Sequence, residues 1–141
     1  MRFVSLEADM ATGLFLLLAR VLIAAMFLSS GYVALSNLAG TAGYFAGLGL
    51  PAPRLVAWGV GLFECVAGVL LVAGLFTRPA AALLAAFCVA ASFLGHYGQG
   101  DTPALAFMHT QMLLKDIAVA GGLILLAIHG PGAISLDARR R

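Results

Sequence analysis

The sequence predicts an all-α membrane protein, a single domain folded as a bundle of four transmembrane helices. Of the 141 residues, 62% are hydrophobic and only 10% are charged, whereas about 25% of a typical globular chain is charged. The mean hydropathy is +1.04. The apolar residues also form continuous blocks, and a block of roughly 18 or more residues is long enough to cross a bilayer. We therefore expect lipid to cover most of the surface.

The apolar blocks place the expected spans at residues 12–35, 55–76, 80–96 and 106–128. Residues 41–53, between the first two spans, are too short and too rich in glycine to cross the membrane. We expect them to form an interfacial or re-entrant segment, because Tyr44 suits a membrane interface. Pro131 ends the last span, since proline cannot continue a helix. Residues 129–141 are expected to form a polar tail.

The arginines predict the orientation of the bundle. With four spans, Arg2, Arg78 and residues 139–141 lie on one side of the membrane, and Arg54 lies on the other. Positively charged residues near the ends of spans favour the cytoplasm. Both termini are therefore expected to be cytoplasmic.

Four ionisable residues lie inside the expected spans: Arg20, Glu64, Lys115 and Asp116. Each would cost at least about 2.5–3.5 kcal/mol if unpaired at the middle of the membrane. Arg20 lies about eight residues into the first span, and Glu64 lies about nine residues into the second from the opposite side. At a rise of about 1.5 Å per residue, both reach a similar depth. We expect the two to form an ion pair.

Small residues recur on the same helix faces as these charges: Ala57, Gly61 and Gly68 beside Glu64, and Gly13, Ala24 and Gly31 beside Arg20. Small residues let membrane helices approach closely, so these faces should point into the bundle. The expected pair then either only holds the two helices together or belongs to a polar cavity that binds a head group or moves protons. We favour the cavity, because ionisable groups inside membranes commonly mark functional sites.

A second polar group lies near the end of the third span and in the first half of the fourth. His109 and Asp116 are seven residues apart and share one helix face, whereas Gln111 and Lys115 share another. His96 closes the third span and is expected to exchange protons near neutral pH. Two histidines and an aspartate could hold a metal, but no HxH or HxxxH spacing supports one. We therefore expect no metal site.

Two other classes of function are disfavoured. Cys65 and Cys88 both lie in apolar blocks without a CxxC motif, which is typical of small buried hydrophobic residues and not of a redox pair. No basic stripe runs along the chain, so nucleic acid is not expected as a partner.

A series of short motifs is spread along the chain. They are Ala19-Arg20, Ser30-Gly31, Gly49-Leu50-Pro51, Glu64 with Gly68, Gly74-Leu75-Phe76-Thr77-Arg78, His96, Lys115 with Ala120-Gly121-Gly122, Gly130-Pro131-Gly132 and Ser135-Leu136-Asp137. On these motifs the sequence resembles the DoxX family of small bacterial membrane proteins from Leu18 to Asp137. Two features depart from the family pattern. Many members carry Lys a few residues after the glycine at position 31, and many carry Asn where this sequence has Asp116.

The resemblance implies a four-helix protein of the bacterial inner membrane. Relatives in the family are associated with quinone-linked oxidation, sulfur metabolism and membrane complexes that handle oxidative stress. Branches that use paired cysteines for redox work do not match this sequence.

The sequence thus favours a small redox-associated membrane subunit that binds a quinone-like or other amphipathic ligand. The residues expected to act are Glu64, Arg20 and His96 as catalytic groups and Lys115, Asp116, Gln111 and His109 as ligand contacts. No GxGxxG, CxxCH or haem-ligand pair is present, so we expect no tightly bound electron carrier, and a protein partner or a second copy would complete the reaction. The alternative is a structural or assembly subunit without chemistry of its own. A transporter or channel is less favoured, because four short helices leave little room for a pathway.

Overall fold

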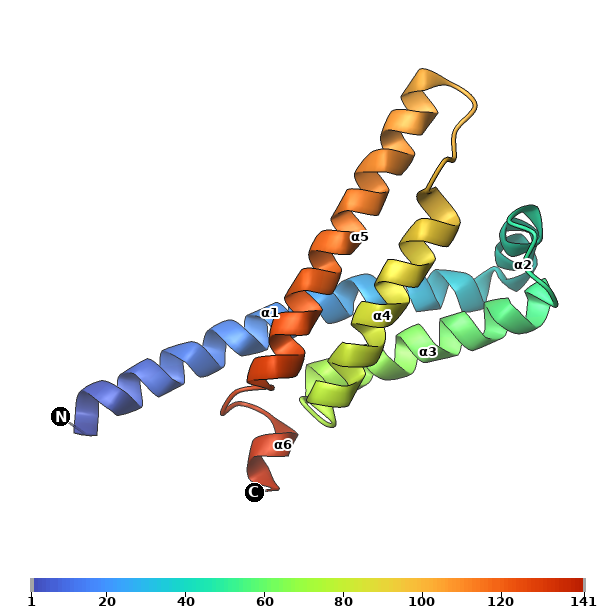
Figure 1. Ribbon diagram of the computed structural model, residues 1–141. Coiled ribbons are helices and arrows are strands. Elements are labelled where there is room, and N and C mark those ends of the chain that lie inside the picture. The colour runs from blue at the N-terminus through green and yellow to red at the C-terminus, as the bar shows by residue number, and fades with distance from the viewer. Residues whose placement is uncertain (1, 141) are drawn as a thin grey trace.

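The computed structural model describes the backbone of residues 2–140 and the side chains of residues 10–140, and helices joined by turns and loops make up this part of the chain. The helices are α1 (Arg2–Ser36), α2 (Leu38–Gly47), α3 (Pro53–Ala73), α4 (Thr77–His96), α5 (Pro103–His129) and α6 (Leu136–Arg139) (Figure 1). Four segments are long and apolar enough to cross a membrane: residues Met10–Ser36 of α1, and the whole of α3, α4 and α5. The four expected spans are confirmed.

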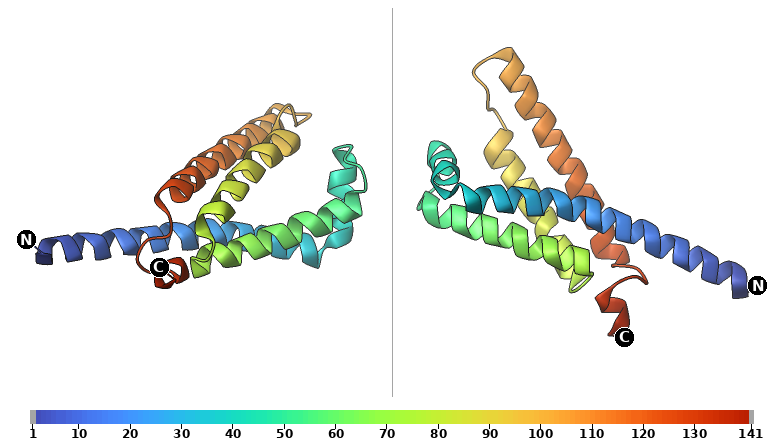
Figure 2. Two further views of the ribbon diagram at one scale, coloured as in Figure 1. Left: turned by 60° about the horizontal axis from the view of Figure 1, so that its bottom comes forward. Right: turned by 180° about the vertical axis from the view of Figure 1, so that it is seen from behind.

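The long helices form two antiparallel pairs that diverge from a common end. α1 lies beside α3, and α4 lies beside α5, as all the views show (Figures 1 and 2). We call these pairs the α1–α3 arm and the α4–α5 arm. They meet where the α3–α4 turn and α6 lie, and they separate toward α2 and the α4–α5 loop (Figure 1). The bundle is therefore splayed and not a set of four parallel rods.

Small residues fix the register of the α1–α3 arm. A Cβ atom on Gly31 would lie 2.7 Å from Sγ of Cys65 and 2.8 Å from the backbone oxygen of Gly61. A Cβ on Gly68 would lie 2.8 Å from Cγ of Leu28. Both glycine stripes are buried, as expected, because only glycine permits this close approach of the two backbones.

The core lies where the two arms meet. Phe87 of α4 packs against Phe63 of α3 at 5.2 Å and against Phe27 of α1 at 6.5 Å between ring centroids. Leu84 of α4 and Leu123 of α5 are fully buried in the same core. Large apolar side chains cover the outside of the helices, among them Phe15, Leu22, Leu83, Phe107 and Leu125. This surface suits lipid as the surrounding solvent.

The α3–α4 turn comes three residues earlier than the sequence suggests. Gly74 has φ +67° and Phe76 has φ +48°, so both take the left-handed conformation. α4 then begins at Thr77, and Pro79 lies in its first turn. Proline is tolerated there because the first N–H groups of a helix have no partner within the helix.

The expected interfacial segment contains a helix of its own. The side chain of Asn37 accepts a hydrogen bond from the backbone N–H of Gly40 and caps the start of α2. The Tyr44 hydroxyl then donates a hydrogen bond to the backbone carbonyl of Gly95 at 3.4 Å. α2 therefore links the α1–α3 arm to the far end of α4.

Candidate functional site

Glu64 lies in the middle of α3 and is almost completely buried, with 5% of its surface exposed. The side chain of Ser30 from α1 lies near its carboxylate. The second carboxylate oxygen, Oε2, has no hydrogen-bond partner within residues 2–140. A buried polar atom without a partner costs free energy in the folded protein, so it commonly marks a place where another polar group binds.

Three side chains join α4 to α5 beside the loop between them. Nδ1 of His96 lies 3.0 Å from Nδ1 of His109, so one nitrogen donates a hydrogen bond and the other accepts it. Nε2 of His96 lies 3.8 Å from Oδ2 of Asp116. We call His96, His109 and Asp116 the His96 cluster. The shared helix face expected for His109 and Asp116 is confirmed, because both lie beside His96.

One face of α4 connects this cluster with Glu64. Cys88, Ser92 and His96 recur at four-residue spacing, which places them one above another on a helix. Cys88 is buried and lies within electrostatic range of both Asp116 and Glu64. Ser92 is fully buried and donates a hydrogen bond to a backbone carbonyl of α5. Glu64 of the α1–α3 arm and Asp116 of the α4–α5 arm therefore both act on the middle of α4.

Two residues expected to contact a ligand lie apart from the His96 cluster. Lys115 is exposed and Gln111 is half-buried, and neither makes an ion pair or hydrogen bond in the described part of the chain. Successive residues on a helix are rotated by about 100°. Lys115 therefore does not follow its neighbour Asp116 into the cluster.

Arg20 is fully buried, but at the end where the arms meet and not beside Glu64. Its Nη2 donates a hydrogen bond to the backbone carbonyl of Ile134. The guanidinium lies against Gly74 and within electrostatic range of Asp137. Its Nε and Nη1 have no partner among residues 2–140.

The expected ion pair between Arg20 and Glu64 is therefore wrong. The expectation estimated the depth of each residue by counting from the end of its own span. The register of α1 against α3 is instead set by the contact of Gly31 with Gly61. Arg20 lies eleven residues before Gly31 in α1. Because α3 runs antiparallel to α1, the end of α3 at Gly74, and not Glu64, lies opposite Arg20. Gly74 follows Glu64 by ten residues, which is about 15 Å along a helix.

The C-terminal segment does more than form a polar tail, because it folds back on the α3–α4 turn. The carboxylate of Asp137 accepts hydrogen bonds from the backbone N–H groups of Phe76 and Thr77, each at 2.9 Å. The Asp137 N–H donates to the carbonyl of Gly74 at 2.8 Å. Phe76, at the N-cap position of α4, makes no side-chain capping bond. Asp137 thus caps α4 from a distant part of the chain.

The ionised form of Asp137 suits this role. Desolvation alone would raise its pKa, but the hydrogen bonds from Thr77 and Phe76 and the charge of Arg140 outweigh it and lower the pKa. Ser135 starts α6 by accepting a hydrogen bond from the N–H of Ala138 at 3.1 Å. In the sequence, Phe76 stands where α4 would need a capping side chain, and phenylalanine cannot cap a helix. This could have indicated that α4 is capped from elsewhere, but it does not identify Asp137 as the cap.

The His96 cluster is suited to hydrogen bonding and proton transfer, since it places imidazoles in contact with each other and with a carboxylate. Among residues 10–140, no group of three or more His, Cys, Asp or Glu side chains is arranged to hold a metal ion. The Nδ1 atoms of His96 and His109 face each other in a hydrogen bond.

Comparison with known proteins identifies the family. The family model described as DoxX matches residues 15–97, more than half of the chain. The chain belongs to the DoxX family. The matched segment holds Arg20, Glu64, Cys88 and His96, so the resemblance seen in the sequence is confirmed.

Two curated proteins are similar over most of their length. The chain is 37% identical to inner membrane protein YphA of Escherichia coli (strain K12) over 124 residues, covering 88% of this chain and 89% of YphA. It is 33% identical to inner membrane protein YqjF of the same organism over 121 residues, covering 86% and 88%. No solved structure matches the chain. This DoxX-family protein is thus an inner-membrane protein, embedded in the bilayer through four apolar helices.

Proposed function

We propose that this DoxX-family protein binds a quinone-like or other amphipathic molecule between its two arms, beside Glu64, and acts in the oxidation or reduction of that molecule with a protein partner. The observation that carries the proposal is the unpartnered Oε2 of the buried Glu64 carboxylate. A carboxyl group in apolar surroundings gains a hydrogen bond from a ligand that brings a hydroxyl or carbonyl oxygen to it.

The two oxygens of the ring are assigned to polar groups on the two arms. Glu64 comes from the α1–α3 arm, and the His96 cluster comes from the α4–α5 arm. Glu64 and Asp116 both act electrostatically on Cys88 of α4. Phe63 and Phe87 pack together beside Glu64 and offer apolar faces to a ring. The proposal assigns ligand contact to these groups and not to Arg20, Lys115 or Gln111.

Proton exchange gives these groups a chemical role. Reducing a quinone to the hydroquinone takes up two electrons and two protons, and oxidation releases them. Glu64 and the His96 cluster would donate or accept the protons at the two ring oxygens. The electrons would pass to or from the partner, because the sequence carries no motif for a tightly bound electron carrier.

Fluorescence provides a direct test. The single tryptophan, Trp58, lies on α3 less than two turns from Glu64, and quinones quench tryptophan. The protein in mild detergent is titrated with a short-chain quinone, and extracts of the purified protein are analysed for bound quinone by mass spectrometry. Glu64→Leu should weaken the saturable quenching about tenfold, because the hydrogen bond that a protonated Glu64 carboxyl donates to a quinone oxygen is lost. Asp101→Asn, in the exposed α4–α5 loop, is the control and should bind like the wild type. Equal binding by Glu64→Leu would refute the proposal.

A structural or assembly subunit is the second candidate. Only 22% of the residues in the most apolar window of α1, and 17% in that of α5, are buried within the chain. These helices therefore offer most of their surface to lipid or to another membrane protein. A preparation that contains no small molecule but a partner at fixed stoichiometry would favour this second candidate.

We also infer that both termini are cytoplasmic, from the arginines gathered at one end of the spans. Single cysteines are placed at Gln99 and at Ala138 after Cys65 and Cys88 are replaced by alanine. A membrane-impermeant thiol reagent added to spheroplasts should label Gln99→Cys and leave Ala138→Cys unlabelled. The reverse pattern would overturn the orientation.

A further inference from the structure

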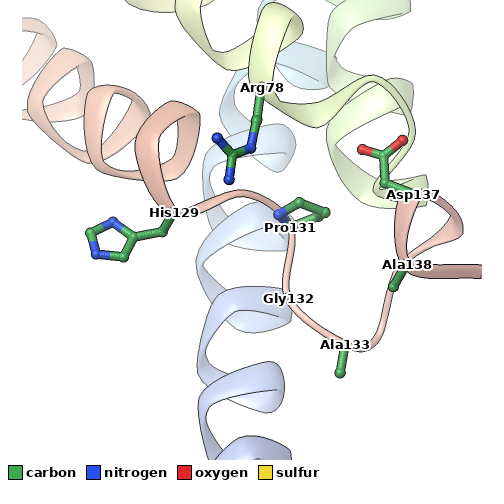
Figure 3. Close-up of a pocket in the computed structure, with 7 residues that line it drawn as sticks. All are labelled: Arg78, His129, Pro131, Gly132, Ala133, Asp137 and Ala138. Atoms are coloured by element: carbon green, nitrogen blue, oxygen red, sulfur yellow. The ribbon is translucent and has the colours of Figure 1, made fainter. Parts of the chain in front are cut away.

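Two adjacent pockets open at the end where the arms meet. The larger has a volume of about 280 Å³ and lies between Arg78, His129, Pro131 and Asp137 (Figure 3). The smaller has a volume of about 210 Å³ and lies between Phe76, Arg78 and Pro131, again with Asp137 in its wall. Arg78 lines both pockets and is the group that a shared ligand would meet.

The Arg78 guanidinium is available for a ligand. It extends from the first turn of α4 toward the loop after α5 (Figure 3). Gly130, with φ +85°, lets it approach closely, since a Cβ there would lie 3.2 Å from Nε and 3.5 Å from Nη2. Arg78 makes no ion pair or hydrogen bond within residues 2–140. A guanidinium offers five N–H donors, and all of these remain unused by the described protein.

The charge around the pockets selects an anion. Arg139 and Arg140 come two and three residues after Asp137, and the Arg140 guanidinium lies 5.7 Å above the ring of Phe76. Asp137 is the one carboxylate in the pocket walls. Its two oxygens already accept backbone hydrogen bonds from the start of α4. Arg78, Arg139 and Arg140 outnumber this one carboxylate, so the net charge around the pockets is positive.

The position of the site relative to the bilayer indicates the kind of anion. α4 begins one residue before Arg78, and α5 ends at His129. Arg78 therefore lies at the border of the apolar spans, at the level of lipid phosphates. Exposed apolar side chains continue from the site along both helices, with Leu83 and Ile128 each 61% exposed. These side chains can contact the acyl chains of a lipid whose head group is held by Arg78.

We propose that the pockets around Arg78 bind the phosphate group of an anionic phospholipid. The guanidinium matches a phosphate geometrically, because its N–H groups can pair with two phosphate oxygens at once. Free inorganic phosphate shares this chemistry and is the competing source. A lipid bound here would contact α4, α5 and the C-terminal segment together, and it would hold the arms at their common end.

Native mass spectrometry of the full chain in detergent tests the site. Phosphatidylglycerol and phosphatidylcholine are added at equal concentrations, and the bound fractions are compared. The wild type should retain phosphatidylglycerol in preference. Arg78→Gln should weaken that binding about tenfold, because it removes a charge-assisted contact, whereas Arg78→Lys should keep part of it. Arg54→Gln, at the opposite end of α3, is the matched control and should bind like the wild type.

Equal retention of the two lipids by the wild type, or unchanged binding by Arg78→Gln, would overturn the proposal. Displacement of phosphatidylglycerol by excess inorganic phosphate would assign the site to free phosphate, and lack of displacement would support the lipid. A second measurement needs no variant of Arg78. Phosphatidylglycerol should raise the thermal unfolding midpoint of the wild type more than phosphatidylcholine does, and equal shifts would count against the site.

Discussion

The buried guanidinium of Arg20 packs directly against the α-carbon of Gly74. A Cβ atom at position 74 would overlap Nη1 of Arg20 and would lie 2.5 Å from Cβ of Ser135. The carbonyl of Gly74 also accepts the hydrogen bond from the N–H of Asp137. The first span, the α3–α4 turn and the C-terminal segment are therefore held together at one point.

Gly74→Ala should lower the stability of the protein strongly. The left-handed conformation at φ +67° alone costs an alanine about 1–2 kcal/mol, and the overlap with Arg20 adds to this cost. The midpoint of thermal unfolding in detergent should fall by several degrees. Gly59→Ala is the control on the same helix, since a Cβ there meets nothing within 4 Å. Similar midpoints for the two variants would contradict this packing.

Asp137→Asn should destabilise the protein at neutral pH by about 1 kcal/mol, because an amide has one acceptor oxygen and loses one of the two backbone hydrogen bonds. The pKa of Asp137 is lowered in the folded protein, so its stabilisation is complete above the unfolded value of about 3.9. The stabilisation is lost as the pH falls through the folded pKa. The gap in unfolding midpoint between wild type and variant should therefore be full at pH 7 and shrink below about pH 4. A gap that does not change with pH would exclude the ionised cap.

The sequence predicted those features that depend on composition and helix period. Long apolar blocks determine the four spans, and small residues three or four apart determine the buried faces of α1 and α3. The seven-residue spacing of His109 and Asp116 likewise places both on one side of α5. These features are local, so the chain pattern is sufficient to find them.

Features that depend on how helices slide past each other were not predictable in this way. The register of Arg20 is set by the contact of Gly31 with Gly61, which depth alone does not reveal. The docking of Asp137 on Thr77 joins residues sixty positions apart through backbone N–H groups. Backbone donors have no sequence signature, so the partner of the tail could be found only in three dimensions.

Arg20→Gln and Glu64→Gln should have additive effects on stability. The two positions are about 15 Å apart along α3 by the helical rise, and substitutions more than about 7–10 Å apart add to within about 0.5 kcal/mol. Thermal unfolding of both single variants and the double variant measures this. The pair Arg20→Gln with Asp137→Asn is the contrasting case and should be non-additive, because these charges interact. Recovery of stability in the Arg20–Glu64 double variant would mean that the two side chains pair after all.

His96→Ala should weaken quinone binding several-fold while leaving the fold intact. His96 is the one member of the cluster that contacts both others, so its loss removes the hydrogen bond to His109 and the ion pair with Asp116 together. The side chains of His96 and Asp116 are 21% and 30% exposed, so water can replace these contacts, and the cost in stability should stay near 1 kcal/mol.

In the Trp58 quenching assay, His96→Ala and Asp116→Asn should each lose affinity, and the double variant should lose less than the sum, because the two residues act together. His129→Ala, at the opposite end of α5, should bind the quinone like the wild type. Wild-type affinity in His96→Ala would reduce the His96 cluster to a contact that joins α4 to α5.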